Sequence, residues 1–181
     1  MKAIKINSFF LVWLGASLFL SCEDKKEVAN VRYEGPVEEV QNVKVLYSEQ
    51  GDLKVLMRTP KQLRFLNDNK VFPDTVNIDF YDPNGSVTTH LRADSGNYQK
   101  NEDIYVVKGN VRVNMSLTNQ LLTTTELKWS PRTKKVFTEK HLTVRNRSTG
   151  EITHGVGMDA EQDFSRIKFR KGTGKYRVDI P

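Results

Sequence analysis

From Val43 onward, the chain consists of short segments in which apolar and polar residues alternate, separated by clusters of turn-forming residues. A period of two residues places alternate side chains on opposite faces of a strand, so that one face is buried and the other meets water. The alternation is clear in residues 76–80, 111–115 and 166–170, and residues 123–129 begin with β-branched threonines before they alternate. Each of these segments is predicted to be a strand.

The turn-forming clusters are rich in Gly, Pro, Asn, Asp and Ser, and they recur every 14 to 18 residues between Asp82 and Arg147. Such regular spacing is typical of consecutive antiparallel hairpins. No segment after residue 43 has a convincing helical pattern, so we predict an all-β domain built as one continuous antiparallel meander. The predicted turns are residues 49–52, 67–70, 82–85, 100–103, 116–119, 130–133, 147–150 and 171–174.

The amino terminus has a different pattern. Lysines precede an apolar run at residues 9–20, and Ser21 then stands before Cys22, the only cysteine of the chain. This order predicts a lipoprotein signal peptide over residues 1–21, whose cleavage exposes Cys22 for lipidation. A plain signal peptide and an uncleaved anchor are the alternatives, but the run is shorter than the ~20 residues of a spanning helix. Two or more acyl chains would hold the mature protein durably at a membrane surface.

The 181 residues are enough for one domain and a tether. Residues 22–42, with few apolar positions, are predicted to form the lipidated tether, and residues 43–181 the folded domain. The net charge is +6, and the signal segment holds two lysines and no acid, so the mature part carries +4. A balance this modest is common in ordinary domains and identifies no partner.

Candidate catalytic chemistry is sparse. His90, His141 and His154 do not have the spacing of metal ligands. The glycine-rich residues 172–175 do not form a phosphate loop, because Tyr176 stands where Ser or Thr is required. Neither a nucleophile elbow nor an aromatic and basic nucleic-acid surface is present in the sequence. We therefore predict a binding protein rather than an enzyme, with no catalytic residues, metal, cofactor or nucleic-acid partner.

Six short motifs, taken together in their order, resemble the LptC family, the periplasmic component of the lipopolysaccharide export machinery. The resemblance covers residues 43–170, and many family members differ from this chain in having a transmembrane anchor. The motifs are Gly51-Asp52-Leu53, Phe72-Pro73 and residues 91–98, 104–113, 122–127 and 152–160.

The resemblance implies a β-jellyroll, a folded-over meander of the OstA/LptA-like type with a slot between its two sheets. It also implies that the protein receives lipopolysaccharide from an ATP-driven ABC transporter complex in the inner membrane and passes it to a periplasmic LptA-like jellyroll. With lipidation at Cys22, the expected location is the periplasmic face of the inner membrane. The alternative is a surface-exposed β lipoprotein that binds glycan or protein, for which Trp129 beside a turn is the candidate aromatic.

One face of the alternating strands is expected to line the slot, although the same side chains would also suit an ordinary core. By motif match, Phe72 lies where the family contacts lipid near the slot entrance, and Gly51 lies at the turn near the transporter-facing end. The predicted lipid-binding residues are Phe72, Val76, Ile78, Phe80, Leu91, Val111, Val113, Leu127, Trp129, Leu142, Val144 and Met158.

Overall fold

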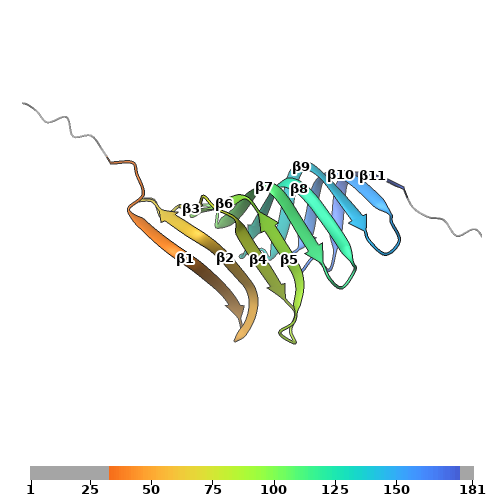
Figure 1. Ribbon diagram of the computed structural model, residues 1–181, viewed down its shortest axis with the longest axis horizontal. Helices are drawn as coiled ribbons and strands as arrows, with labels where there is room; N and C mark the ends of the chain where they lie inside the picture. The colour runs from red at the N-terminus through yellow and green to blue at the C-terminus, as the bar shows by residue number, and fades with distance from the viewer. Residues whose placement is uncertain (1–32, 176–181) are drawn as a thin grey trace, which may run out of the picture. The chain divides into compact units, whose positions relative to one another are not determined.

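The computed structural model describes residues 33–175, which contain one antiparallel sheet and no helix (Figure 1). The all-β prediction is confirmed, and the described residues include no helix long and apolar enough to cross a membrane. The strands are β1 (Glu38–Glu49), β2 (Asp52–Arg64), β3 (Lys70–Phe72), β4 (Val76–Tyr81), β5 (Val87–Ala93), β6 (Ser95–Gln99), β7 (Ile104–Met115), β8 (Gln120–Ser130), β9 (Lys135–Asn146), β10 (Ile152–Glu161) and β11 (Ile167–Lys175).

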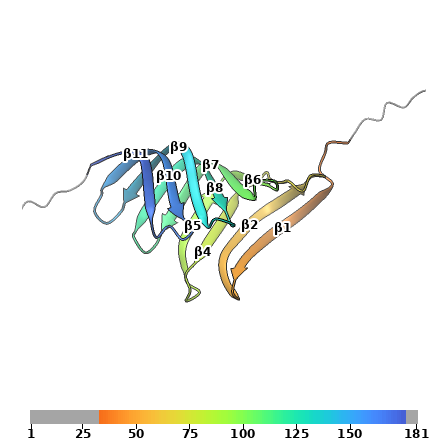
Figure 2. The same ribbon diagram turned by 180° about the vertical axis from the view of Figure 1, so that it is seen from behind.

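The sheet is a meander in which each long strand pairs with its sequence neighbours. Strands β3 and β4 both pair with β2, so together they form one interrupted strand. Strands β5 and β6 form a second interrupted strand, because both pair with β7. Seen in this way, the order from β1 to β11 follows the sequence throughout, as Figures 1 and 2 show from opposite sides. The predicted continuous meander is confirmed.

The hairpin turns depend on residues with positive φ, which Gly, Asn and Asp tolerate best. Each turn contains at least one such residue: Gln50, Gly51, Asp68, Gly85, Asp103, Asn119, Lys134, Gly150 and Phe164. The predicted turn at residues 171–174 is wrong, since these residues lie inside β11 and pair with β10. The glycines there are strand residues, and the preceding turn is formed by residues 162–166 instead.

A line of irregularities, which we call the crease, crosses every long strand near its middle. Its members are opposite one another in the register: Pro60 of β2 lies between the pairs Gln41↔Lys61 and Val43↔Thr59. Register shifts occur where the crease crosses β7, β8, β9 and β10. Bulges bend the strand that carries them, so their alignment bends the whole sheet along one line. The crease consists of Asn42, Pro60, residues 73–75, Asp94, Gly109, Asn110, Thr125, residues 139–141, Gly157 and Arg170.

The crease divides the sheet into two half-sheets whose inner faces meet. Phe80 of β4 and Trp129 of β8 lie on different half-sheets, yet their ring centroids are only 6.4 Å apart. The buried hydrophobic residues of both parts belong to a single cluster. The first half-sheet comprises residues 43–59, 76–93, 111–124, 142–156 and 171–175, and the second comprises residues 38–41, 61–72, 95–108, 126–138 and 158–169.

Strand β1 begins at Glu38 rather than at Val43. Residues 38–42, predicted to belong to the tether, are therefore part of the sheet, and the predicted end of the tether at residue 42 is wrong. Residues 38–41 pair with residues 61–64 of β2. The alternation is hidden in the sequence because Asn42 has a φ of 53°, and Val40 and Val43, three residues apart, are both half-buried. The predicted signal peptide, Cys22 and the start of the tether lie outside the described residues.

Candidate functional site: the apolar interior and its mouth

The twelve predicted lipid-binding residues all lie in the interior, where each is at most 8% exposed. Eight of them come from the first half-sheet, and Phe72, Leu127, Trp129 and Met158 come from the second. The structure therefore confirms that the alternating strands direct these side chains to one shared interior. Whether they contact lipid there stays a prediction.

Several interior residues escaped the sequence analysis. Val55 and Met57 of β2 are buried, but the apolar Leu56 between them obscures the alternation. Leu122 and Val136 each lie close to a turn, where the periodic segment is short. Phe164 is buried although it lies in the turn between β10 and β11, and no periodic pattern in the sequence marks it.

An aromatic row extends along the second half-sheet and reaches the first. Tyr98 and Tyr105 have ring centroids 4.6 Å apart, and Tyr105 stacks on Trp129 at 5.2 Å. Trp129 then meets the edges of Tyr47 at 5.6 Å and Phe80 at 6.4 Å. Burial and a hydrogen bond to Asp103 raise the pKa of Tyr98 to about 12, and burial also raises the pKa of Tyr105. The two tyrosines remain neutral at physiological pH, and their hydroxyl groups add a few polar atoms to a mainly apolar interior.

Trp129 is the residue on which the glycan-binding alternative depends, and it is 8% exposed. Its indole Nε1 donates a hydrogen bond to Gln162 Oε1 at 3.4 Å, so its polar atom is satisfied inside the protein. A sugar-stacking site needs an accessible ring face. The position of Trp129 does not favour that alternative.

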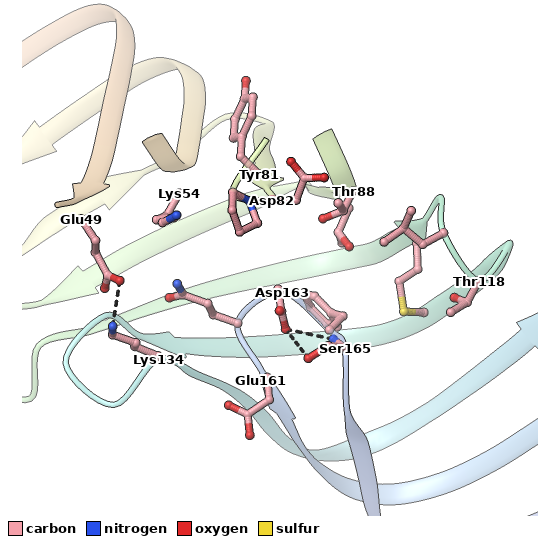
Figure 3. Close-up of a pocket in the computed structure, with 16 residues that line it drawn as sticks. Glu49, Lys54, Tyr81, Asp82, Thr88, Thr118, Lys134, Glu161, Asp163 and Ser165 are labelled. Carbon is pink, nitrogen blue, oxygen red and sulfur yellow. Dashed lines mark hydrogen bonds and ion pairs between the residues drawn. The ribbon is translucent and has the colours of Figure 1, made fainter. Parts of the chain in front are cut away.

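A groove of about 380 Å³ opens between the rims of the two half-sheets (Figure 3). Its first rim includes Tyr81, Pro83 and Leu117, which belong to turns and strand ends of the first half-sheet. Its second rim includes Lys134 and Phe164, from turns of the second half-sheet. Leu117 is 81% exposed, an unusual position for a leucine that lines a groove. We call this groove the mouth.

An ion pair joins the two rims at one end of the mouth. Lys134 Nζ lies 2.7 Å from Glu49 Oε2, and Figure 3 shows the two side chains reaching toward each other. Tyr47 donates a hydrogen bond from its hydroxyl to Glu49 Oε1 at 2.7 Å. The hydrogen bonds from Lys134 and Tyr47 lower the pKa of Glu49, and the same carboxylate raises the pKa of Tyr47. Glu49 is therefore ionised at neutral pH, and the pair connects the end of β1 to the turn between β8 and β9, far apart in the sequence.

The family model for lipopolysaccharide assembly, LptC-related, matches residues 9–176. The chain belongs to the LptC family. The protein is accordingly a component of lipopolysaccharide transport, in a family that is periplasmic and associated with the inner membrane. A search of curated proteins finds no match to the chain.

Two LptC motifs, residues 91–98 and 104–113, contribute to the crease. The backbone N–H of Asp94 donates to the carbonyl oxygens of Lys108 and Gly109 at 3.1 and 3.0 Å. Its carboxylate accepts from Asn110 Nδ2 at 2.6 Å and is also paired with Arg92. These contacts tie the bend between β5 and β6 to the bulge within β7, so these motif residues have a structural role that involves no ligand.

Phe72, which the LptC resemblance places near the slot entrance, is 1% exposed and packs against Gly96. A Cβ on Gly96 would lie 3.4 Å from the Phe72 ring and 3.1 Å from the carbonyl oxygen of Val106. The Phe72 ring also contributes to a second depression, of about 500 Å³, beside Lys70 and Tyr98. Phe72 is therefore a packing residue next to a surface hollow, and its contact with lipid stays a prediction.

Gly51 lies in the turn between β1 and β2 with a φ of 91°, and a Cβ there would meet no atom within 4 Å. A left-handed conformation of this kind favours glycine for backbone reasons alone. The open space around Gly51 is compatible with a partner surface, as the LptC resemblance implies. The role of Gly51 in a partner interface remains a prediction.

The histidines His90 and His154 bond to neighbouring polar side chains of the same sheet. His90 Nδ1 lies 2.6 Å from Asp79 Oδ1, and Arg58 pairs with the other oxygen of that carboxylate. His154 Nδ1 lies 3.0 Å from the hydroxyl of Thr143. Within residues 33–175, no group of three His, Cys, Asp or Glu residues is placed to hold a metal ion.

Proposed function

We propose that this protein receives lipopolysaccharide from an ATP-driven transporter complex in the inner membrane and passes it to a periplasmic LptA-like jellyroll. The observation that carries the proposal is the single apolar interior between two half-sheets, to which all twelve predicted residues contribute. The acyl chains would lie between the half-sheets while the sugars remain in water.

The physical reason for such an interior is the cost of exposing fatty acyl chains. Each methylene group transferred from water gains about 0.8 kcal/mol, so a lipid with several chains needs a continuous apolar route. A meander bent along a crease provides that route, because its inner face runs uninterrupted from β2 to β10. The aromatic row would give the chains flat surfaces to slide along rather than one deep pocket.

The edges of the sheet suit handover between jellyrolls. Among the described strands, β1 pairs only with β2, and β11 pairs only with β10. An edge strand offers unpaired N–H and C=O groups to which another sheet can add a strand. We assign the β1 edge, next to Gly51, to the transporter and the β11 edge to the next jellyroll, which would make the apolar interiors continuous.

The membrane anchor of the proposal is the lipid on Cys22, which would keep the protein at the periplasmic face of the inner membrane. Replacing Cys22 with serine would remove the acylation site and leave the domain unchanged. We expect the Cys22→Ser variant to lose its mass increment from the acyl groups and to leave the inner-membrane fraction. A membrane-bound, unmodified variant would contradict the lipid anchor but not the transport role.

Photo-crosslinking in living cells tests the transport proposal directly. A photoreactive amino acid at Val113, whose side chain is buried in the interior, is expected to form an adduct with lipopolysaccharide. The neighbouring Arg112 faces outward on the same strand and is the matched control, for which little adduct is expected. A second interior position, Phe80, repeats the test near the mouth. Equal adducts at Val113 and Arg112, or adducts only with protein or sugar, would contradict the proposal.

A further inference from the structure

Phe164 is the one turn residue of the described chain that combines a positive φ with a buried aromatic side chain. Its φ is 59°, and its side chain is 5% exposed. The other positive-φ turn residues are Gly, Asn, Asp, Gln or Lys, which face water. A bulky residue in the left-handed region is unfavourable, and such conformations persist where the surroundings enforce them and often where function needs them.

The surrounding turn holds the Phe164 backbone in this conformation. Asp163 Oδ1 accepts hydrogen bonds from the backbone N–H of Ser165 at 3.0 Å and from its hydroxyl at 2.7 Å, as Figure 3 shows. The backbone N–H of Phe164 donates to the Glu161 carbonyl oxygen at 2.9 Å. The turn is thus a small, locally bonded unit that points one ring inward.

The ring of Phe164 fills space between the two half-sheets at the mouth. It meets Phe80 of the first half-sheet edge to face, with ring centroids 5.6 Å apart. Phe164 comes from the second half-sheet, so this contact crosses the gap that an acyl chain would have to enter from the side. The Glu49–Lys134 ion pair crosses the same gap on the surface.

We propose that the mouth is a lateral site for the admission of one fatty acyl chain, with Phe164 as its plug and the Glu49–Lys134 pair as its clasp. This inference rests on the proposed transport function. The 380 Å³ volume is within the range of roughly 300–1,000 Å³ that small-molecule sites have. Exposed Leu117 at the lip gives an arriving chain a first apolar contact. The two lysines of the lining, Lys54 and Lys134, are already paired with Asp52 and Glu49, so the site is assigned to the acyl chain and not to its headgroup.

Admission exchanges one apolar occupant for another. When the turn swings outward, the Phe164 ring leaves Phe80, and methylene groups of the chain take its place against the same ring. Breaking the clasp has little cost, because a partly exposed ion pair contributes little to stability. The release of the left-handed Phe164 backbone favours the open state and offsets part of the lost aromatic contact.

A reversible cross-link across the clasp tests the inference. The Glu49→Cys and Lys134→Cys substitutions are combined in the full-length protein in nanodiscs and joined by a reducible bismaleimide. Fluorescent lipopolysaccharide is the probe. We expect the cross-linked protein to lose most of its uptake and to regain it when the linker is reduced. The matched control joins Glu39→Cys and Lys61→Cys, an ion pair of 3.1 Å within the second half-sheet that does not line the mouth, and should leave uptake unchanged.

Removing the plug gives a second readout. Phe164→Ala is expected to raise the initial rate of uptake several-fold without changing the amount bound, whereas Phe137→Ala removes a half-buried ring from the outer face of β9 and should leave the rate unchanged. Thermal unfolding checks that each variant is folded. If the wild-type protein takes up no lipopolysaccharide, the transport proposal fails together with this inference. If the wild-type loads and the clasp cross-link leaves loading unchanged, the lateral mouth alone is refuted.

Discussion

Gly109 lies so close beneath Asp94 that a Cβ at Gly109 would come within 2.8 Å of the Asp94 carboxylate oxygen and 2.9 Å of its Cβ. The two residues come from different LptC motifs and meet at the crease. The close approach allows Asp94 to bond both the Lys108 and Gly109 carbonyl groups, so one glycine sets how sharply the sheet bends.

The first prediction compares two glycines with similar backbone conformations. Gly109 and Gly85 have φ values of 77° and 80°, but only Gly109 has neighbours within 4 Å. We expect Gly85→Ala to lower the free energy of unfolding by about 1 kcal/mol from the backbone alone. Gly109→Ala should lower the free energy of unfolding by a further ~1–3 kcal/mol, because Asp94 has to move. Urea denaturation measures both, and equal losses would show that the contact with Asp94 is unimportant.

Phe80 provides a test of the interior. Its ring is 1% exposed and meets both Trp129 and Phe164. We expect Phe80→Ala to lower the free energy of unfolding by about 3–5 kcal/mol, as is usual for a buried phenylalanine. Leu66, which is 67% exposed, is the control, and Leu66→Ala should change stability by less than about 0.5 kcal/mol. A small effect at Phe80 would mean that the half-sheets do not depend on each other for stability.

Gly51 allows its backbone role to be separated from its role at an interface. Gly150 has a φ of 76° in another turn of the first half-sheet, and it also has open space around it. Valine at either position is expected to cost about 1–3 kcal/mol in strain. If Gly51 faces the transporter, Gly51→Val and the better tolerated Gly51→Asn should both reduce co-purification with the transporter complex, whereas Gly150→Val should not. Equal co-purification of the Gly51 and Gly150 variants would rule out the assigned interface.

The tyrosines of the aromatic row predict a loss of stability in alkali. The folded pKa of Tyr98 is about 12 and exceeds the usual value of about 10, so the folded state keeps its proton where the unfolded state loses it. Stability from this group is complete below pH 10 and decreases as the pH rises toward 12. Tyr105 has a raised pKa and acts in the same direction.

Urea denaturation at several alkaline pH values, with tyrosinate absorbance as a second signal, measures this effect. Tyr98→Phe cannot ionise at this position, so its stability should depend less steeply on pH between 10 and 12. An identical pH dependence in the two proteins would contradict the assignment. Because the unfolding free energy is compared within each protein, the packing change in Tyr98→Phe does not affect the conclusion.

Much of the fold is predictable from local patterns. The segments 76–80 and 111–115 alternate because each lies entirely on one side of the crease, and their apolar residues all point inward. The turns at residues 82–85 and 147–150 are predictable because positive φ values select Gly, Asn and Asp there. Alternation also identifies the interior residues, because a strand with one solvent-exposed face directs its apolar side chains to the opposite, buried face.

The crease and the mouth cannot be predicted from the local alternation of apolar and polar residues. Thr59 and Gln62 are both buried although they are three residues apart, because the bend at Pro60 shifts the phase of the alternation. The bend is produced by the combined register of all the strands, so the sequence of any single strand carries only a weak signal of it. Phe164 is equally hidden, since its burial depends on a half-sheet more than 70 residues earlier in the sequence, around Phe80.

The strict succession of neighbouring strands has a consequence for how the chain reaches its folded state after export. A strand that emerges from a translocation channel finds its partner already in place, so pairing proceeds in the order of synthesis and never waits for a distant segment. The same property makes the architecture extensible. Another hairpin after β11 would lengthen the apolar interior without disturbing the registers already formed, and the length of that interior is therefore open to adjustment through evolution one hairpin at a time.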